Sequence, residues 1–216
     1  MTWGGRLIAL FPASIVALFL ASVVGIARAS CFSHSLAALF IALSVLFIVP
    51  PGAYRIHNRI WPLKSGGSRL VGKGYSPWFG GHQIQLVYFA FPWLESGLRL
   101  VPGLYSAWLR LWGSKVGRSV YWTPAVEISD RALMEIGDHV VFGHRVVVFG
   151  HVIKPRRGNM LLVVKRVSIG DGAFIGAGVV LAPGAVVAAG AFVEAGTHVY
   201  PNERVEAEEH VQAEAP

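Results

Sequence analysis

A six-residue periodicity in the second half of the chain constrains its fold more than any other feature. From Ile169 onward an aliphatic residue recurs at every sixth position, and a small residue follows each of the first four. The series is Ile169, Ile175, Leu181, Val187, Val193 and Val199, with Gly170, Gly176, Ala182 and Ala188 behind its first members. A period of six matches neither the 3.6-residue α-helix nor the coiled-coil heptad. It is typical of short strands joined by tight turns, with one aliphatic side chain per repeat pointing inward.

Two earlier series extend this pattern toward the middle of the chain. They are Ile136, Phe142 and Val148, and before them Val116, Trp122 and Ile128. Three repeats complete one triangular coil, and stacked coils form a parallel β-helix in which each coil buries the apolar face of the next. The sequence therefore predicts an all-β parallel β-helix over residues 116–201.

Longer phrases within the repeat carry a family resemblance. IGDGAFIGAGVVLAPGAVVAAGAFVEAG (169–196) resembles the hexapeptide-repeat acyltransferases, which implies a left-handed β-helix and a homotrimer. IGDHVVFGHRVVVFGH (136–151) is similar to the segment before the catalytic histidine in the galactoside, maltose and envelope-polysaccharide O-acetyltransferase branch. PGLYSAWLRLWGSKVGRSVYWTP (102–124) resembles the lead-in to such repeats. Carbonic anhydrases and nucleotidyltransferase tails also use this fold, so the repeat specifies the fold more than the reaction.

The repeat is interrupted immediately after a histidine. Val148 and Ile169 are 21 residues apart, fifteen more than one period, which predicts an excursion loop over 152–166 with His151 at its base. The resemblance implies that His151 is the catalytic base, which deprotonates an acceptor hydroxyl for attack on the thioester of acyl-CoA or acyl carrier protein. Histidine titrates near neutrality, and a positioned general base contributes about 10²–10⁴-fold. Asp130 and Glu135 are the nearby carboxylates that could orient its imidazole.

Several further residues are candidates for the same site. His144 either helps to orient His151 or the acceptor in an intersubunit cleft, or is an outward-facing surface residue. The candidates for binding the acyl-CoA are Gly176, Gly178, Pro183, Gly184, Lys165 and Arg166. The candidates for binding substrate or headgroup phosphate are Lys154, Arg156 and Arg157, which otherwise form a solvated basic loop. The apolar run MLLVV (160–164) would pack as a strand on a neighbouring subunit or accept an acyl chain.

A metal site of the carbonic anhydrase type is not predicted. That class binds zinc through three histidines, two of them five residues apart, and zinc needs three converging protein ligands. Gly143-His144 matches the first position of the pair, but Phe149 occupies the second. A metal-dependent hydratase is therefore the weakest of three functional hypotheses, behind a non-enzymatic trimeric scaffold at the membrane.

The first fifty residues predict a membrane anchor. The chain is 54% hydrophobic and 14% charged, and much of the apolar excess lies in Leu7–Ala27 and Leu36–Val49. A helix needs about 20 apolar residues to cross the hydrocarbon core, and the second run reaches that length from Cys31. Residues 1–52 are thus predicted to form a transmembrane hairpin that ends at Pro50-Pro51-Gly52. The alternative is a cleavable signal peptide, because Ala27-Arg28-Ala29 has the small-x-small form.

Charge predicts the orientation and the partners of the anchor. A basic stretch follows the second apolar run: Arg55, Arg59, Lys64, Arg69 and Lys73. The positive-inside rule places this side in the cytoplasm, at a bacterial-type inner membrane. Residues 53–115 are predicted to be an interfacial helical linker, with Leu104, Trp108, Leu111 and Trp112 on one helical face. The net charge of +7 is attributed to anionic lipid rather than nucleic acid, for which no motif is present. Residues 202–216 are predicted to be an acidic tail.

Taken together, the sequence predicts a membrane-anchored, trimeric O-acyltransferase that holds no permanent cofactor. Its co-substrate would be acyl-CoA or acyl-ACP, and its acceptor a lipid, a lipid-linked glycan or a similar molecule.

Overall fold

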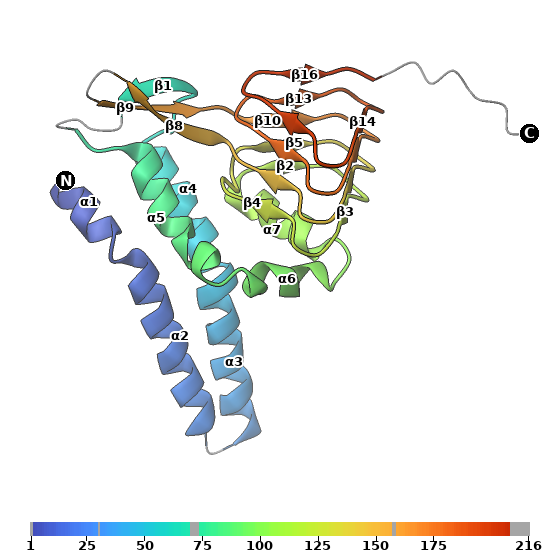
Figure 1. The fold of residues 1–216 in the computed structure, drawn as a ribbon. Helices are drawn as coiled ribbons and strands as arrows, with labels where there is room; N and C mark the ends of the chain where they lie inside the picture. The colour runs from blue at the N-terminus through green and yellow to red at the C-terminus, as the bar shows by residue number, and fades with distance from the viewer. Residues whose placement is uncertain (1, 30, 70–73, 157–158, 208–216) are drawn as a thin grey trace, which may run out of the picture.

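The C-terminal half of the chain is a left-handed parallel β-helix. The hexad pattern predicts the parallel β-helix, and the family resemblance implies its left hand. The computed structural model describes residues 2–29, 31–69, 74–156 and 159–207. Helices from the N-terminal half lie along the side of the β-helix and across its first coil (Figure 1). A hairpin of two long helices projects away from this assembly.

Three parallel sheets form the sides of the described β-helix. The first contains β2 (Lys115–Val116), β5 (Met134–Ile136), β10 (Val167–Ile169), β13 (Val186–Val187) and β16 (Arg204–Val205). The second contains β3 (Tyr121–Trp122), β6 (Val141–Phe142), β11 (Phe174–Ile175) and β14 (Phe192–Val193). The third contains β4 (Glu127–Ile128), β7 (Val147–Val148), β12 (Val180–Leu181) and β15 (His198–Val199). The first sheet thus continues past the predicted end of the β-helix at residue 201.

The strand register explains the six-residue period. Phe142, Ile175 and Val193 occupy one column of the second sheet, and each is almost fully buried. At several corners between neighbouring columns the coils approach so closely that only glycine fits without a shift of the backbone. A Cβ on Gly176 would lie 2.6 Å from the backbone nitrogen of Ala195, which accounts for the glycine at this position.

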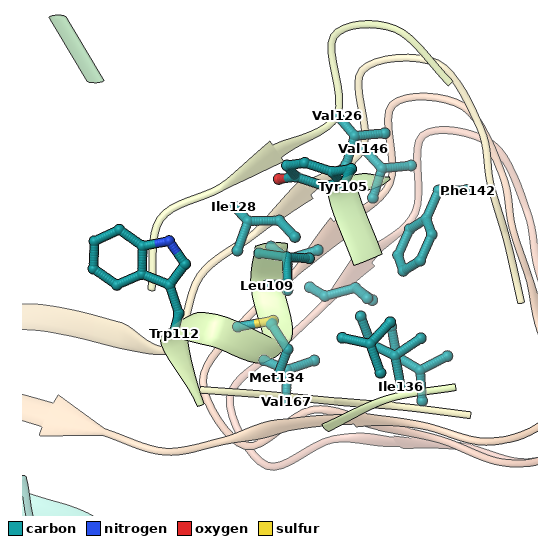
Figure 2. Packing of buried hydrophobic residues seen from close by; sticks show 14 of the residues in the cluster. Tyr105, Leu109, Trp112, Val126, Ile128, Met134, Ile136, Phe142, Val146 and Val167 are labelled. Atoms are coloured by element: carbon teal, nitrogen blue, oxygen red, sulfur yellow. The ribbon is translucent and has the colours of Figure 1, made fainter. Parts of the chain in front are cut away.

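Helix α7 (Leu104–Trp112) packs beside the first coil. Figure 2 shows Tyr105, Leu109 and Trp112 beside core residues of the β-helix such as Ile128 and Met134. The predicted apolar face of this helix was wrong in part, because Leu104 and Leu111 are 41% and 45% exposed. The buried face instead carries Tyr105, Trp108, Leu109 and Trp112, at the i, i+3, i+4 and i+7 spacing of a helix packed on one side.

The remaining helices run from the N-terminus to α7. They are α1 (Trp3–Ile8), α2 (Phe11–Ala27), α3 (Phe32–Phe47), α4 (Val49–Ile60), α5 (Pro77–Ala90) and α6 (Trp93–Arg99). The segment Trp3–Ala27 contains an 18-residue stretch with a mean hydropathy of 2.6, of which 6% is buried, so its length and composition suit a membrane span. The prediction that the helix ends at Pro50 and Pro51 is wrong. Both prolines lie in the first turn of α4, which follows α3 after a bend of 41°. Proline is tolerated there because the first turn of a helix needs no amide donor.

The predicted excursion is an antiparallel hairpin in its described residues. Strands β8 (His151–Arg156) and β9 (Asn159–Val164) pair with each other, and β1 (Gly66–Arg69) adds a third strand. Leu162 and Val164 of β9 are buried against Trp78 of α5. One face of the apolar run is therefore covered by a helix of its own chain, while Met160 on the run is 41% exposed.

The burial pattern of the hexads makes a direct test of this fold possible. Replacing Ile175 with alanine removes a side chain with 0% exposure from the β-helix interior, and should lower the free energy of unfolding by about 2–5 kcal/mol. Glu194→Ala, at an exposed position of the same coil region, should change it by less than about 0.5 kcal/mol. Denaturant unfolding of detergent-solubilised protein, followed by circular dichroism, measures both. Equal losses would contradict the inward orientation of Ile175.

Candidate functional site

His151 is paired with Asp130 at one corner of the β-helix. The Nδ1 atom of His151 lies 2.7 Å from Oδ2 of Asp130, and the backbone amide of Gly150 donates to the same oxygen at 2.8 Å. Asp130 is only 4% exposed. An ionised carboxylate only accepts hydrogen bonds, so a neutral imidazole paired with it carries its proton on Nδ1 and leaves the lone pair on Nε2. This arrangement holds His151 in the tautomer that a general base requires.

The strand register brings these two residues together. Ile128 of β4 pairs with Val148 of β7, so residues two positions further along each coil are stacked on one another. Asp130 therefore lies beside Gly150, and His151 follows directly. Gly150 is required here, since a Cβ at this position would come within 2.8 Å of the Leu133 side chain. Of the two candidate carboxylates, Glu135 does not reach His151 and forms an ion pair with Lys115.

Helix α5 covers His151 with two aromatic side chains that the sequence analysis did not select. The rings of Trp78 and His151 are 4.7 Å apart between centroids, and those of His82 and His151 are 6.0 Å apart. Trp78 and His82 stack on each other, as their i, i+4 spacing on one helix allows. That spacing is the only sequence signal that could have grouped them, and it does not indicate His151 as their partner.

The surroundings of His82 disfavour its charged form. Burial lowers the pKa of His82, and the neighbouring His151 lowers it further. Its Nδ1 atom and the Nε1 atom of Trp78 are buried without hydrogen-bond partners among the described residues. Unsatisfied buried polar atoms are uncommon in folded proteins and often occur at functional sites.

Some of the predicted binding residues share the corner of His151. Pro183 and Gly184 follow β12, the next strand above β7 in the same sheet, and Gly184 adopts a positive φ of 80°. Lys165 leaves the hairpin at this corner and donates from Nζ to Oδ1 of Asn202 at 2.5 Å. The structure thus brings His151, Lys165 and the Pro183-Gly184 turn to one edge of the β-helix.

Other predicted residues lie elsewhere. His144, Gly176 and Gly178 occupy the corner between the second and third sheets, one side of the triangle away from His151. His144 is exposed, and its Nδ1 lies 3.1 Å from the carbonyl oxygen of Pro124. Within one chain the structure therefore separates His144 and these two glycines from the His151 corner.

The basic residues of the excursion are spread along it. Lys154 and Arg156 are exposed on β8, and Arg157 lies outside the described residues. Arg166 is partly buried and donates from Nη1 to the carbonyl of Met134 at 3.3 Å. Among the described residues no group of three His, Cys, Asp or Glu side chains is arranged to hold a metal ion.

The strand geometry and the repeat define a hexapeptide-repeat β-helix. Residues 166–201 match the profile of the family described as "Bacterial transferase hexapeptide (six repeats)". No protein with a curated description matches the chain in sequence.

Several solved structures are similar to part of the chain. A hexapeptide-repeat-containing acetyltransferase from Vibrio cholerae has 19% identity and a TM-score of 0.42, covering 55% of this chain and 82% of its own. The same acetyltransferase complexed with acetyl coenzyme A has 20% identity and a TM-score of 0.42, with coverages of 57% and 80%. A maltose O-acetyltransferase from Clostridium difficile 630 has 18% identity and a TM-score of 0.39, with coverages of 50% and 72%.

The buried position of His82 predicts a pH dependence of stability. Its folded pKa lies below the value of about 6.5 for an unfolded histidine, so the unfolded chain binds more protons as the pH falls below 6.5. His82 therefore contributes stability that is complete above that pH and declines below it, until the folded pKa is reached. His82→Gln should flatten the decline of the thermal midpoint between pH 7.5 and 5. His198→Gln, which replaces an exposed histidine, should leave the slope unchanged.

Proposed function

We propose that this protein is a membrane-anchored acyltransferase that moves an acyl group from acyl-CoA or acyl-ACP to a hydroxyl group, with His151 as general base. The observation that carries the proposal is the Asp130–His151 pair, located where the hexad repeat is interrupted. The match of residues 166–201 to a transferase hexapeptide profile supports the same class of reaction.

The geometry suits direct transfer. The Nε2 atom of His151 accepts the proton of the acceptor hydroxyl as its oxygen attacks the thioester carbonyl carbon. The tetrahedral intermediate then collapses, the carbon–sulfur bond breaks, and the imidazolium returns its proton to the leaving thiolate. Asp130 stabilises the transient imidazolium and keeps the ring in place, as the carboxylate does in other histidine-based catalytic groups. A covalent enzyme intermediate is not required.

The thioester would lie along the edge that carries Lys165 and the Pro183-Gly184 turn. Lys165 is a cation beside that turn, and the basic side chains of Lys154 and Arg166 are suited to the phosphates of the donor. His144, Gly176 and Gly178 lie at a different corner, so they complete this site only if a second subunit contributes them. This separation supports a homotrimer whose active sites lie between subunits.

The N-terminal helices suggest where the acceptor is located. Helices α2 and α3 are apolar and largely exposed, which suits a transmembrane hairpin. The basic residues that follow favour a cytoplasmic β-helix at a bacterial-type inner membrane. An enzyme held there would act on a lipid or a lipid-linked glycan.

Substitutions at the histidine pair test the proposed reaction. His151→Ala should lower kcat about 10²–10⁴-fold in an assay of thiol release from acetyl-CoA with membrane-lipid extract as acceptor. Asp130→Asn should also lower kcat, since an amide no longer fixes the reactive tautomer. His198→Ala should leave the rate unchanged. Undiminished thiol release by His151→Ala protein of normal size and membrane content would refute the role of His151.

A further inference from the structure

A cavity lies apart from the corner that carries His151, where the connection between α6 and α7 meets the first coil of the β-helix. Its volume is about 570 Å³, and its lining includes Arg99, Arg110 and Arg118. None of the residues described along its wall is acidic. On the coil side the cavity is bordered by residues 117–122, around the turn between β2 and β3, whereas His151 follows β7. The cavity therefore has a positive lining that the proposed acyl transfer does not use.

Arg99 is a buried cation whose charge is incompletely compensated. Its side chain is 5% exposed, and its guanidinium lies 4.2 Å from the ring centroid of Tyr105. Its Nη2 donates to the carbonyl of Val126 at 2.7 Å, which carries no compensating charge. Its closest acidic contact is Glu95, at 3.5 Å, but Glu95 is bonded more closely to Arg131 and also accepts the Tyr105 hydroxyl at 2.6 Å. The Nε atom of Arg99 has no partner among the described residues. A buried charge is costly unless it is paired, so this wall of the cavity favours an anion.

The start of α7 adds to the positive potential. Its N-cap is Gly103, which has no side chain to bond the first amides, and its first turn contains no acidic residue. The first amides of a helix lack intrahelical partners and form the positive end of the helix dipole. Gly103 and Ser106 both line the cavity. A helix N-terminus that opens beside three arginines is well suited to an anionic oxygen group.

The other two arginines of the cavity differ in how firmly their guanidinium groups are held. Arg110 is held by bonds from Nε to the carbonyl of Val116 at 2.8 Å and from Nη2 to that of Gly117 at 2.6 Å. Arg118 is exposed, and its backbone amide donates to Oδ1 of Asp138 at 2.6 Å, whereas its side chain forms no ion pair with any described residue. The planar guanidinium binds phosphate through two parallel hydrogen bonds, a geometry that lysine cannot provide.

The position of the cavity indicates what carries the phosphate. Helix α6 lies against the α2–α3 hairpin, with Leu94 and Leu98 beside Phe19 and Leu43 in a shared apolar groove. Helix α6 also lies at the end of the β-helix toward which the α2–α3 hairpin projects (Figure 1). Directly after α6, Leu100 and Val101 are 84% and 54% exposed, and Val101 lines the cavity. Apolar side chains beside a cationic cavity are typical of a surface that contacts lipid headgroups and the upper part of their chains.

We propose that this cavity binds the phosphate group of an anionic membrane lipid, with Leu100 and Val101 against its hydrocarbon. The inference rests on the membrane anchor of the proposed function but not on acyl transfer. The bound lipid would fix the distance of the β-helix from the bilayer, because Arg99 of α6 and Arg110 of α7 are both hydrogen-bonded to backbone carbonyls of the first coil.

Binding of short-chain lipids to the full chain in neutral detergent tests this proposal. Native mass spectrometry would follow titrations with dihexanoyl phosphatidic acid, dihexanoyl phosphatidylcholine and glycerol 3-phosphate. Phosphatidic acid should bind most tightly, and Arg118→Gln should weaken it about tenfold, the effect of one lost charge-assisted hydrogen-bonding group. Arg118→Lys should lose less affinity. Arg204→Gln makes the same change in charge at the other end of the β-helix and should bind like the parent.

Three outcomes would overturn the proposal. Equal affinity for phosphatidic acid and phosphatidylcholine would exclude recognition of an anionic phosphate. Equal losses for Arg118→Gln and Arg204→Gln would show that net charge, not the cavity, attracts the lipid. Glycerol 3-phosphate binding as tightly as phosphatidic acid, with the same loss in Arg118→Gln, would exclude the membrane as the source of the ligand. Since the readout is binding, these results are independent of whether His151 catalyses acyl transfer, and insertion into phosphatidylcholine vesicles tests the anchor separately.

Discussion

The parallel pairing of β4 with β7 is the interaction on which the candidate site depends. It aligns Ile128 with Val148 in the core and thereby stacks the turn after one strand on the turn after the other. Asp130 then accepts both the Gly150 amide and the His151 imidazole. Because one oxygen serves the backbone and the catalytic candidate, the carboxylate is fixed by the fold before any substrate arrives. A residue inserted or deleted between the two strands would change this register and separate the pair.

A buried cluster of charged and polar side chains joins helices α5 and α6 to the coil that carries Asp130. Arg131, next to Asp130, is 2% exposed and forms an ion pair with Glu95 of α6. Its backbone amide donates to Gln85 of α5 at 2.9 Å. Removing one partner of a buried pair leaves an uncompensated charge and typically costs 3–5 kcal/mol, whereas the intact pair contributes much less. The cluster is thus better understood as a device that fixes where α5 and α6 sit than as a source of stability.

The repeat could be predicted from the sequence because each hexad obeys the same local rule. The inward aliphatic residue, the small residue and the turn follow one another within six positions, and no distant contact is needed to recognise them. The choice of Asp130 over Glu135 also follows from the register once the columns are drawn, since Glu135 directly precedes an inward residue and must point outward. His82 and Trp78 could not be predicted in this way. Their contact with His151 joins segments far apart in the chain, and no local pattern encodes where a helix docks.

The face of α7 shows a second limit of periodicity. Leucine and tryptophan spacing selected Leu104 and Leu111, but the structure buries Tyr105 and Leu109 instead. The Tyr105 hydroxyl bonds Glu95, and the Trp108 indole donates to the carbonyl of Phe47 at 3.0 Å. These two hydrogen bonds favour the observed rotation of the helix, since a buried hydroxyl or indole N–H usually has a partner. A hydrophobicity pattern counts these side chains as apolar and does not detect that requirement.

These contacts make the N-terminal helices part of the candidate active site rather than a simple tether. Helix α5 contacts α2 of the apolar hairpin, and it also places Trp78 and His82 over His151. Apolar cover lowers the local dielectric, which would strengthen the interaction of Asp130 with the imidazolium of the proposed reaction. A shift of α5 relative to the β-helix would admit water and weaken that interaction without altering either residue. The environment of the proposed base is therefore coupled to the position of the apolar hairpin, and a β-helix freed of its N-terminal helices would lack both the cover and the contacts that orient it.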